Sequence, residues 1–305
     1  MKQITNKSPQ QHGLLRRDFM TLMGASATLP LFGCSSVWAQ GDSVLPLNTP
    51  RVDHLDVIVP DVEATSKFYM GVFNTRLHAQ EFRGGKRYFV LLGELPENRQ
   101  VGYLAIGDSR GRGTYIGHFC TSVFNWRENS KAIMDGISAA SVKAGLGEIK
   151  SAGGFGGIFA DPDGIEIQFL PAPDTLVTAA VPSDLVEYNK GLVTPLGVDH
   201  ALLKVSDLDK AVTFYRILYG KEAIKEKNPE RIWFKIGNTR LGLQQVQGDE
   251  KPHIDHFCVQ VKPFDKKAVS EGLTKLGAKV VASPDEKDVL RFVDIDGVTA
   301  EIIAV

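Results

Sequence analysis

Hydrophobic and polar residues follow a strand pattern and then a helix pattern in the stretch that begins at residue 200. Residues 200–206 (HALLKVS) alternate as a β-strand does, and Asp207 follows where a helix N-cap belongs. Apolar residues then recur at helical spacing from Leu208 to Tyr219. Three short strand-like segments come next, at 222–227, 231–237 and 240–246. The pattern predicts a unit of one strand, one helix and three strands.

The same order of elements restarts and fills the rest of the chain. Residues 253–261 (HIDHFCVQV) form the next strand pattern, and Asp265 precedes a helix pattern through Val269, Leu273 and Leu276. Three more strand-like segments close the chain, at 278–283, 289–295 and 299–305. The first half of the chain gives the same order between residues 52 and 171. We therefore predict an α+β fold built from four βαβββ units.

Short motifs return in the same order in the two halves of the chain, which indicates a duplicated domain. Four motifs do so: VDH at 52–54 and 198–200, Phe-Tyr at 68–69 and 214–215, (G/D)HFC at 117–120 and 255–258, and D-x-D-G at 161–164 and 294–297. The repeats predict two tandem domains at 46–172 and 196–305, joined by a proline-containing linker at 173–195.

The N-terminal segment has the pattern of an export signal rather than of a folded element. Arg16-Arg17 precedes a moderately apolar run at 19–33, which is shorter than the about 20 residues of a membrane span. This arrangement resembles a twin-arginine signal. Two cleavage positions fit the sequence of the signal: one before Cys34, which would then be lipidated, and one after Ala39. We expect residues 1–45 to be signal and disordered start, and the protein to be periplasmic, or membrane-anchored if Cys34 carries a lipid.

Composition and charge exclude some classes of function. The chain has 305 residues, of which 43% are hydrophobic and 23% charged, which is ordinary for a globular protein with two cores. The net charge is −1 and no long Lys/Arg run follows residue 17, so the basic surface of a nucleic-acid-binding protein is absent. Three scattered cysteines do not make a disulfide framework. No segment has the length of a membrane span.

Three predicted strands of the second domain each present one side chain that can bind a metal. His200, His256 and Glu301 fall on the alternating positions that face away from the apolar, helix-packing side of each strand. Two histidines and one carboxylate are the set that holds Fe(II) or Mn(II) with open coordination positions. A single strand histidine is more often a hydrogen-bonded core group, so the interpretation depends on all three residues lying together.

The four strand–helix–three-strand units resemble the vicinal oxygen chelate superfamily, which includes glyoxalases, bleomycin-resistance proteins and extradiol dioxygenases. The resemblance covers residues 50–172 and 196–305, and the D-x-D-G turn before the last strand of each domain is a further marker. In that family the ligands lie on the first, fifth and eighth strands, the positions of His200, His256 and Glu301. The resemblance implies two tandem domains of two βαβββ units each. It also implies a divalent metal, with Fe(II) favoured and Mn, Zn or Ni as alternatives.

His54 and His118 match the first two ligand positions in the first domain, but the third position differs. Ungapped alignment of DPDGIEIQF with DIDGVTAEI places Gln168 opposite Glu301, while Glu166 lies two residues earlier on the same face. A neutral Gln lacks the charge that helps to hold a divalent ion, so we expect the first-domain set to be the weaker, degenerate site. A degenerate first domain beside a metal-bearing second domain resembles the two-domain extradiol dioxygenases.

The sequence does not identify the catalytic residues. Extradiol enzymes of this family surround the metal with further His and Tyr residues for proton transfer, but Arg291 stands on the strand before Glu301. Cys120 and Cys258 follow a ligand histidine by two residues, and we interpret them as small pocket-lining residues because nothing nearby would lower a thiol pKa. The sequence is compatible with two places for Trp233, the wall of a pocket and the core.

The sequence therefore predicts an exported metal-dependent enzyme that acts on a small oxygen-bearing molecule, most like an extradiol-type ring-cleaving dioxygenase. Two alternatives stay open. One is a glyoxalase-like isomerase or lyase, in which the metal polarises a carbonyl or an enediolate. The other is a non-catalytic small-molecule binding protein of the bleomycin-resistance type. The sequence identifies neither the substrate nor the oligomeric state, and a homo-oligomer is one of the open alternatives.

Overall fold

The computed structural model describes residues 44–82, 85–93, 102–149, 151–153, 157–172, 190–281 and 287–305. The predicted export signal, with Arg16-Arg17 and Cys34, lies outside the described residues, and so do residues 173–189 of the predicted linker. Val44 and Leu45, the first described residues, contact the core. Among the described residues, no helix has the length and apolar character needed to cross a membrane.

The first domain is one eight-stranded sheet made of two βαβββ units. Its elements are β1 (Val52–Val59), α1 (Val62–Val72), β2 (Leu77–Phe82), β3 (Gly85–Leu92), β4 (Gly102–Asp108), β5 (Tyr115–Phe124), α2 (Trp126–Lys143), β6 (Ser151–Gly153), β7 (Ile158–Ala160) and β8 (Glu166–Ala172). The strand order is β2-β3-β4-β1-β5-β8-β7-β6. The first strands of the two units, β1 and β5, pair antiparallel at the centre, and each has the last strand of its own unit as its other, parallel neighbour.

The second domain repeats this sheet. Its elements are β9 (Thr194–Val205), α3 (Leu208–Tyr219), β10 (Ile224–Lys227), β11 (Glu230–Ile236), β12 (Thr239–Gln245), β13 (His253–Lys262), α4 (Lys266–Lys275), β14 (Lys279–Val281), β15 (Val289–Val293) and β16 (Thr299–Ala304). The order β10-β11-β12-β9-β13-β16-β15-β14 is that of the first sheet, element for element. Asp207 and Asp265 cap α3 and α4 by accepting backbone N–H groups, as predicted. The predicted architecture of four βαβββ units is confirmed.

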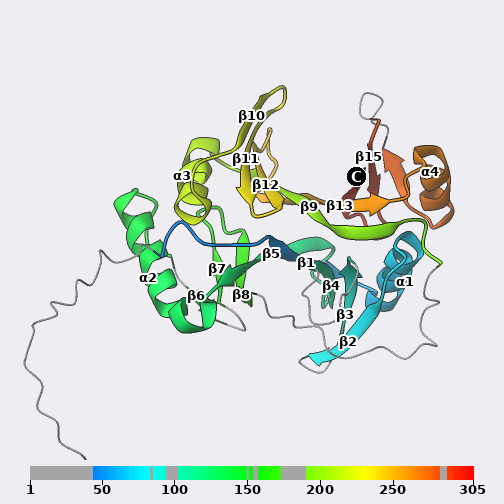
Figure 1. Ribbon diagram of the computed structural model, residues 1–305, viewed down its shortest axis with the longest axis horizontal. Coiled ribbons are helices and arrows are strands. Elements are labelled where there is room, and N and C mark those ends of the chain that lie inside the picture. The colour runs from blue at the N-terminus through cyan, green and yellow to red at the C-terminus, as the bar shows by residue number, and fades with distance from the viewer. Residues whose placement is uncertain are drawn as a thin grey trace, which may run out of the picture. The chain divides into compact units, whose positions relative to one another are not determined.

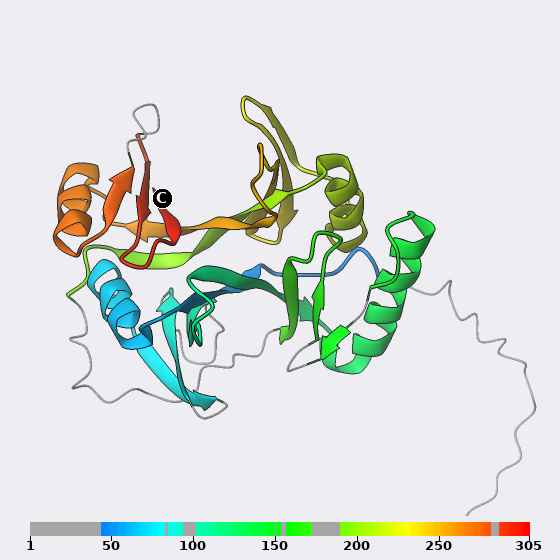
Figure 2. The same ribbon diagram turned by 180° about the vertical axis from the view of Figure 1, so that it is seen from behind.

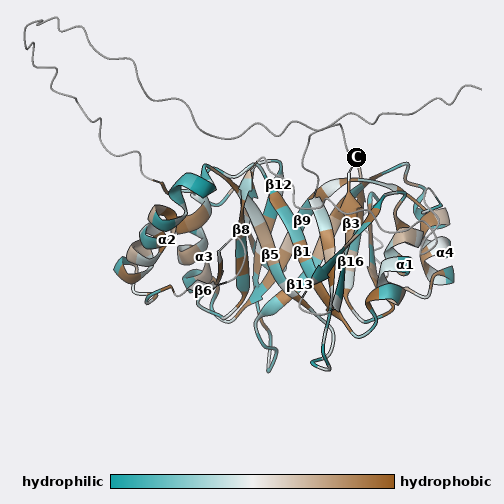
Figure 3. Cartoon of the chain, turned by 90° about the horizontal axis from the view of Figure 1, so that it is seen from below, coloured by the Kyte–Doolittle hydropathy of each residue, from teal (hydrophilic) through white to brown (hydrophobic). Residues whose placement is uncertain are grey.

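One apolar core joins the two sheets, which lie one above the other (Figures 1 and 2). The helices stand in two pairs at the ends of the sheets, α2 with α3 and α1 with α4, and the strands run between them (Figure 3). Each pair combines helices of different domains. Tyr69 of α1 packs against Phe257 of β13, with ring centroids 6.2 Å apart, and Tyr215 of α3 packs against Phe119 of β5 at 6.5 Å. The core therefore belongs to both domains together.

Core residues alternate with the candidate ligands along the central strands. On β9, Ala201, Leu203 and Val205 belong to the shared core, whereas His200 falls on the opposite face. The same alternation on β1 places Leu55 and Val57 in the core and His54 on the other face. The candidate ligands of each domain are therefore expected on the face of its sheet that points away from the other sheet.

Candidate metal sites

His200, His256 and Glu301 meet on neighbouring strands of the second sheet. The Nε2 atoms of the two histidines are 3.3 Å apart, and Glu301 Oε2 is 3.4 Å from His200 Nε2 and 3.6 Å from His256 Nε2. All three residues are buried. Ligand atoms about 2.1 Å from one ion, at angles of roughly 90–110°, lie about 3.0–3.4 Å from one another. The donor atoms, two imidazole nitrogens and one carboxylate oxygen, therefore fit a divalent metal in both chemistry and spacing.

Each of these ligands is oriented by a charged partner. Asp199 Oδ1 lies 2.7 Å from His200 Nδ1, and Asp255 Oδ2 lies 2.5 Å from His256 Nδ1. A carboxylate on Nδ1 holds the proton there and leaves the Nε2 lone pair for a metal. Arg291 Nε donates to Glu301 Oε1 at 2.7 Å, so Arg291 holds one carboxylate oxygen while the other faces the histidines.

The electrostatic environment keeps Glu301 ionised. Burial raises the pKa of Glu301, but His200, His256 and Arg291 outweigh it and lower this pKa to about 2. Burial by itself lowers the pKa of His200, but Asp199 and Glu301 together raise it above 6.5. Burial dominates at His256 and lowers its pKa in spite of Asp255. The negative charge that attracts a divalent ion is thus present at neutral pH.

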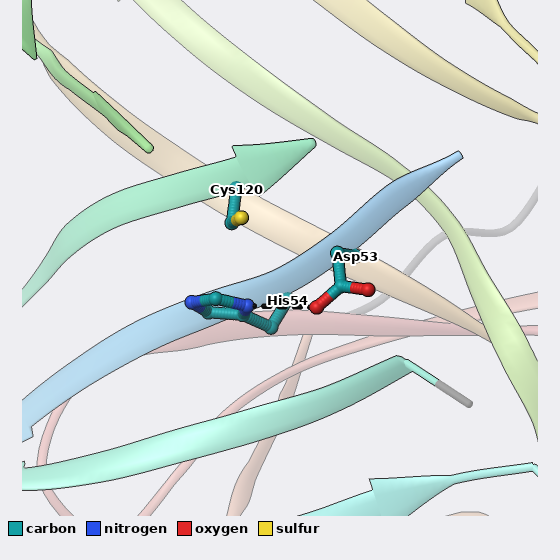
Figure 4. Close-up of side chains that lie close together, drawn as sticks. All are labelled: Asp53, His54 and Cys120. Carbon is teal, nitrogen blue, oxygen red and sulfur yellow. Dashed lines mark hydrogen bonds and ion pairs between the residues drawn. The ribbon is translucent and has the colours of Figure 1, made fainter. Parts of the chain in front are cut away.

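The first domain repeats this geometry with a neutral third residue. His54 Nε2 and His118 Nε2 are 3.3 Å apart, and Gln168 Oε1 lies 3.2 Å from His118 Nε2. The two rings are 5.4 Å apart at 77°, the same values as for His200 and His256. Asp53 Oδ1 lies 3.0 Å from His54 Nδ1, as the dashed line in Figure 4 shows. The set that we expected to be degenerate keeps the spacing of a metal site.

Gln168 rather than Glu166 is the counterpart of Glu301. In the strand register, Cys120 pairs with Gln168 as Cys258 pairs with Glu301. Glu166 pairs with His118 and is exposed. It lies at the wall of the cavity and not among the assembled donor atoms, so the ungapped alignment identified the structurally equivalent residue.

The aspartates that orient the histidines were not predicted from the sequence. Strict alternation places an Asp and the following His on opposite faces of a strand, but Asp53, Asp199 and Asp255 are each skipped in the strand register. Such an extra residue forms a β-bulge, which re-aims side chains. The bulges bring each Asp to the ring of the next residue. An Asp directly before three of the four candidate histidines was the available signal.

His118 also has a carboxylate partner, but the carboxylate comes from the facing strand and not from the residue before the histidine. At the bulge before His118 the residue is Gly117, and Asp56 of the facing strand supplies the partner, with Oδ2 3.2 Å from His118 Nδ1. In the second domain, Leu202 occupies the position of Asp56 opposite its histidine. A Cβ at Gly117 would lie only 3.2 Å from Asp56 Oδ2, so the glycine makes room for this carboxylate. The two domains therefore reach the same histidine orientation with different residues.

The third residue of the set differs between the two domains, and so does the residue that pairs with it on the neighbouring strand. Arg291 pairs with Glu301 across the strands of the second domain, and Ile158 pairs with Gln168 in the first. A buried carboxylate needs a compensating charge, whereas a buried amide does not. The first-domain site is thus a neutral version of the second-domain site.

A cavity of about 1110 Å³ opens over the first-domain set. His54, His118 and Gln168 line it together with Tyr103 of β4. The Tyr103 ring stacks on His54, with centroids 4.4 Å apart and planes 14° from parallel. Burial, followed by the nearby Asp53 carboxylate, raises the pKa of Tyr103 well above 10, so its hydroxyl stays protonated. Sequence analysis considered a tyrosine only on the strand before the third ligand and therefore missed Tyr103.

Cys120 and Cys258 are buried thiols beside the first histidine of each set. Figure 4 shows the Cys120 sulfur on the strand next to His54, and Asp53, His54 and Cys120 place their donor atoms within 4.8 Å of one another. Burial raises the pKa of both thiols well above 9. Because the thiolate is the form that binds metals and attacks electrophiles, neither cysteine is suited to these roles. Trp233 is buried and meets the His200 ring edge-on, at 5.0 Å.

The sequence matches the model of the Glyoxalase/Bleomycin resistance protein/Dioxygenase superfamily over residues 51–169 and 197–302. Solved structures with the same fold include the 2,3-dioxygenase LapB from Pseudomonas sp. KL28, at 15% identity and a TM-score of 0.61, covering 85% of this chain and 93% of that one. The Mn(II)-bound glyoxalase from Novosphingobium aromaticivorans has 14% identity and a TM-score of 0.61, with 85% and 83% covered. A catechol 2,3-dioxygenase has 13% identity and a TM-score of 0.59, with 85% and 89% covered.

Proposed function

Because this chain belongs to the Glyoxalase/Bleomycin resistance protein/Dioxygenase superfamily, we propose that it is a metal-dependent enzyme that acts on a small oxygen-bearing molecule. One observation carries the proposal: the Nε2 atoms of His200 and His256 and the Oε2 atom of Glu301 lie within 3.6 Å of one another. An ionised carboxylate beside two buried imidazoles is costly unless a positive charge compensates it. Arg291 supplies such a charge at Oε1, and a divalent metal would supply a further one between Oε2 and the two Nε2 atoms.

His200, His256 and Glu301 would hold the metal, Fe(II) in the first place and otherwise Mn, Zn or Ni. Such an ion would supply Lewis acidity toward substrate oxygens or a site for O₂. Asp199 and Asp255 keep the two imidazoles in the tautomer that presents Nε2. Arg291 holds Oε1 of Glu301, so that Oε2 is the oxygen that would face an ion.

The charged second-domain set favours an extradiol-type oxidoreductase. Two histidines and one carboxylate with open positions are the ligands that O₂-activating Fe(II) centres use. Extradiol chemistry requires the substrate to present two neighbouring oxygens. The 2,3-dioxygenase LapB and a catechol 2,3-dioxygenase have the same fold, which supports this choice.

The neutral first-domain set favours the second candidate, a glyoxalase-like isomerase or lyase. His54, His118 and Gln168 contribute no negative charge, so a bound ion would keep its full positive charge for polarising a carbonyl or an enediolate. This set lines the cavity, whereas His200, His256 and Glu301 are not among its lining residues, although residues 252–255 and 297–299 of the second domain are.

Metal analysis and oxygen uptake test the proposal and separate its branches. We expect the purified protein to contain about one divalent ion per chain and to lose its activity on treatment with a chelator. Consumption of O₂ with catechols supports the oxidoreductase, and turnover without O₂ consumption supports the isomerase or lyase. Absence of metal after incubation with Fe(II), Mn(II), Zn(II) and Ni(II) would contradict the proposal and favour a non-catalytic binding protein.

We also propose that the protein is exported by the twin-arginine route and works in the periplasm. Arg16-Arg17 and the apolar run at 19–33 support this location. The candidate ligands come from strands that are far apart in the sequence, so a metal site forms only in the folded chain. An export route for folded proteins would therefore allow the metal to be loaded before export.

A further inference from the structure

The cavity over the first-domain set is lined by cationic side chains at one end. Lys86 and Arg87 of β3 line it, and so do Arg110 and Arg112 of the turn between β4 and β5. A Cβ at Gly107 would lie 3.8 Å from Arg87 Cζ, so this guanidinium lies over the end of β4, where the turn begins. We call these four residues the cationic end of the cavity.

The carboxylates of the lining are placed differently. Among the described residues, those at positions 56, 108, 166 and 255 line the cavity. Asp56 and Asp255 face the Nδ1 atom of the histidine that each orients, and Asp108 accepts a backbone N–H of its own turn. Glu166 stands on β8, and in the strand order β3-β4-β1-β5-β8 the two histidine strands, β1 and β5, separate it from β3. The candidate ligands therefore lie between Glu166 and the cationic residues of β3.

The corresponding turn of the second domain has the opposite charge. Residues 109–114 (SRGRGT) contain two arginines and no carboxylate, whereas residues 246–252 (VQGDEKP) contain two carboxylates and one lysine. Asp249 and Glu250 of the second turn are not among the residues that line the cavity, although the segment 252–255 that follows them is. The arginines thus distinguish the turn that reaches the cavity from its repeated counterpart.

The cationic end lies close to the candidate ligands along the strands. Asp56 pairs with His118, and Ile58, two residues further along β1, pairs with Gly107 and with Tyr115, the first residue of β5 after the turn. Two residues of a strand span about 7 Å. A small molecule with one ring and substituents at both ends can therefore reach from the histidine to the cationic end.

We propose that the substrate of this cavity carries a carboxylate group, which binds at the cationic end while oxygens at the other end of the molecule face His54 and His118. A guanidinium can bind a carboxylate through two parallel hydrogen bonds, and Arg110 and Arg112 offer two such groups. The inference rests on the proposed function for the chemistry at the substrate oxygens, and it adds the class of substrate.

Three probes that differ in one group test the proposal. They are 3,4-dihydroxybenzoate, 3,4-dihydroxybenzamide and 3,4-dihydroxybenzylamine, which share a ring with two neighbouring oxygens and end in a carboxylate, a neutral amide and an ammonium group. In isothermal titration calorimetry the benzoate should bind about three- to tenfold more tightly than the amide, because exposed ion pairs contribute modestly. Added salt should remove most of this difference. Tightest binding of the amine would overturn the proposal by placing the charged group at Glu166.

A pair of double variants locates the carboxylate. Arg110→Gln/Arg112→Gln should lower the affinity for the benzoate to that for the amide and leave the affinity for the amide unchanged. Lys221→Gln/Lys235→Gln is the matched control, because it removes the same charge from exposed positions outside the cavity lining, and it should keep the preference for the benzoate. All four residues are exposed, so thermal unfolding should stay close to that of the wild type. Equal losses in the two double variants would overturn the proposal, because only the net charge of the protein would then matter.

The same titrations without metal and with Mn(II) separate this inference from the proposed function. If the wild type takes up no metal, the proposed function fails, while a preference for the benzoate that depends on Arg110 and Arg112 still supports the cavity as the ligand site. If metal binds but the benzoate binds no more tightly than the amide in either form, the proposed function stands and this inference fails. No binding of any probe to the wild type in either form would also overturn the inference.

Discussion

The hydroxyl group of Tyr69 donates a hydrogen bond of 2.8 Å to Asp294 Oδ2 and so joins α1 of the first domain to the D-x-D-G turn of the second. The reverse contact is also present, since Tyr215 of α3 donates to Asp161 Oδ2 at 2.9 Å. In each aspartate the other oxygen accepts backbone N–H groups of its own turn. The repeated Phe-Tyr and D-x-D-G motifs are therefore partners across the domain interface.

Removing either tyrosine hydroxyl should destabilise the whole protein. Hydrogen bonds to a charged group contribute about 1.5–3 kcal/mol, so Tyr69→Phe and Tyr215→Phe should each lower the free energy of unfolding by an amount in this range. Urea denaturation measures the change, and Tyr88→Phe, which loses only a longer and part-buried hydrogen bond of 3.2 Å to Glu63, serves as the control with a smaller effect. Losses below about 0.5 kcal/mol for both interface variants would show that the contacts are not important for stability.

Asp161 should make the stability depend on pH. Burial raises the pKa of Asp161 from 3.8 to about 6, although Ile165 N–H and Tyr215 oppose the shift. The folded state then binds more protons than the unfolded state between these two values. The contribution of this group is therefore fully present below pH 3.8 and is lost as pH rises through about 6. The loss amounts to about 3 kcal/mol.

The variant Asp161→Asn isolates this contribution, because an amide does not titrate. The free energy of unfolding of the wild type minus that of the variant should decrease as the pH rises from 4 to 7. Urea titrations at half-unit pH steps give the two curves. A difference that stays constant over this range would show that Asp161 has the same pKa in both states.

Glu301 and Gln168 should contribute unequally to metal binding. Glu301→Ala removes the only ionised donor of its set, so most of the metal should be lost from the purified protein, whereas Gln168→Ala should remove little. Mass spectrometry of the metal content after desalting measures both. Equal losses from the two variants would argue against a stronger second-domain site.

A carboxylate on the facing strand should be able to replace the carboxylate of the residue before the histidine. Asp255→Gly removes the carboxylate from His256 Nδ1, and loss of such a partner typically lowers metal affinity 10- to 100-fold. The double variant Leu202→Asp/Asp255→Gly copies the first-domain arrangement of Asp56 and Gly117 and should restore most of the affinity. Competition with a fluorescent chelator gives the dissociation constants. An affinity in the double variant no better than in Asp255→Gly would show that position 202 does not reach the ring.

Export should depend on the paired arginines. Changing Arg16-Arg17 to Lys-Lys should trap a full-length, metal-loaded precursor in the cytoplasm, which cell fractionation and metal analysis detect. Processing and export of the changed protein would contradict the twin-arginine route. A metal-free precursor in the cytoplasm would contradict loading before export while leaving the route intact.

Local patterns were sufficient to predict the elements and to place the three candidate ligands of the second domain on one face. Alternation assigns each residue of a strand to a face, so His200, His256 and Glu301 could be placed on one side of the sheet without knowing how the strands pair. The repeats then supplied the order of the units. Gln168 was placed correctly because the turn before the last strand has the same length in both domains.

Features that depend on pairing could not be predicted in this way. The β-bulges at Asp53, Asp199 and Asp255 reverse the face that alternation assigns to these residues. Asp56 reaches His118 only because β1 and β5 pair in one particular register. The contact between Tyr69 and Asp294 depends on how two sheets pack, which no local pattern records.

The packing of α1 and α3 against strands of the other domain has a consequence for how the chain becomes folded. Tyr69 of the first half packs against Phe257 of the second half, and Tyr215 of the second half packs against Phe119 of the first. A nascent first half that has left the ribosome therefore exposes apolar surface until residues of the second half, 96 positions later for Phe119 and Tyr215 and 188 for Tyr69 and Phe257, are synthesised. Duplication has doubled the architecture here without producing two autonomous folding units.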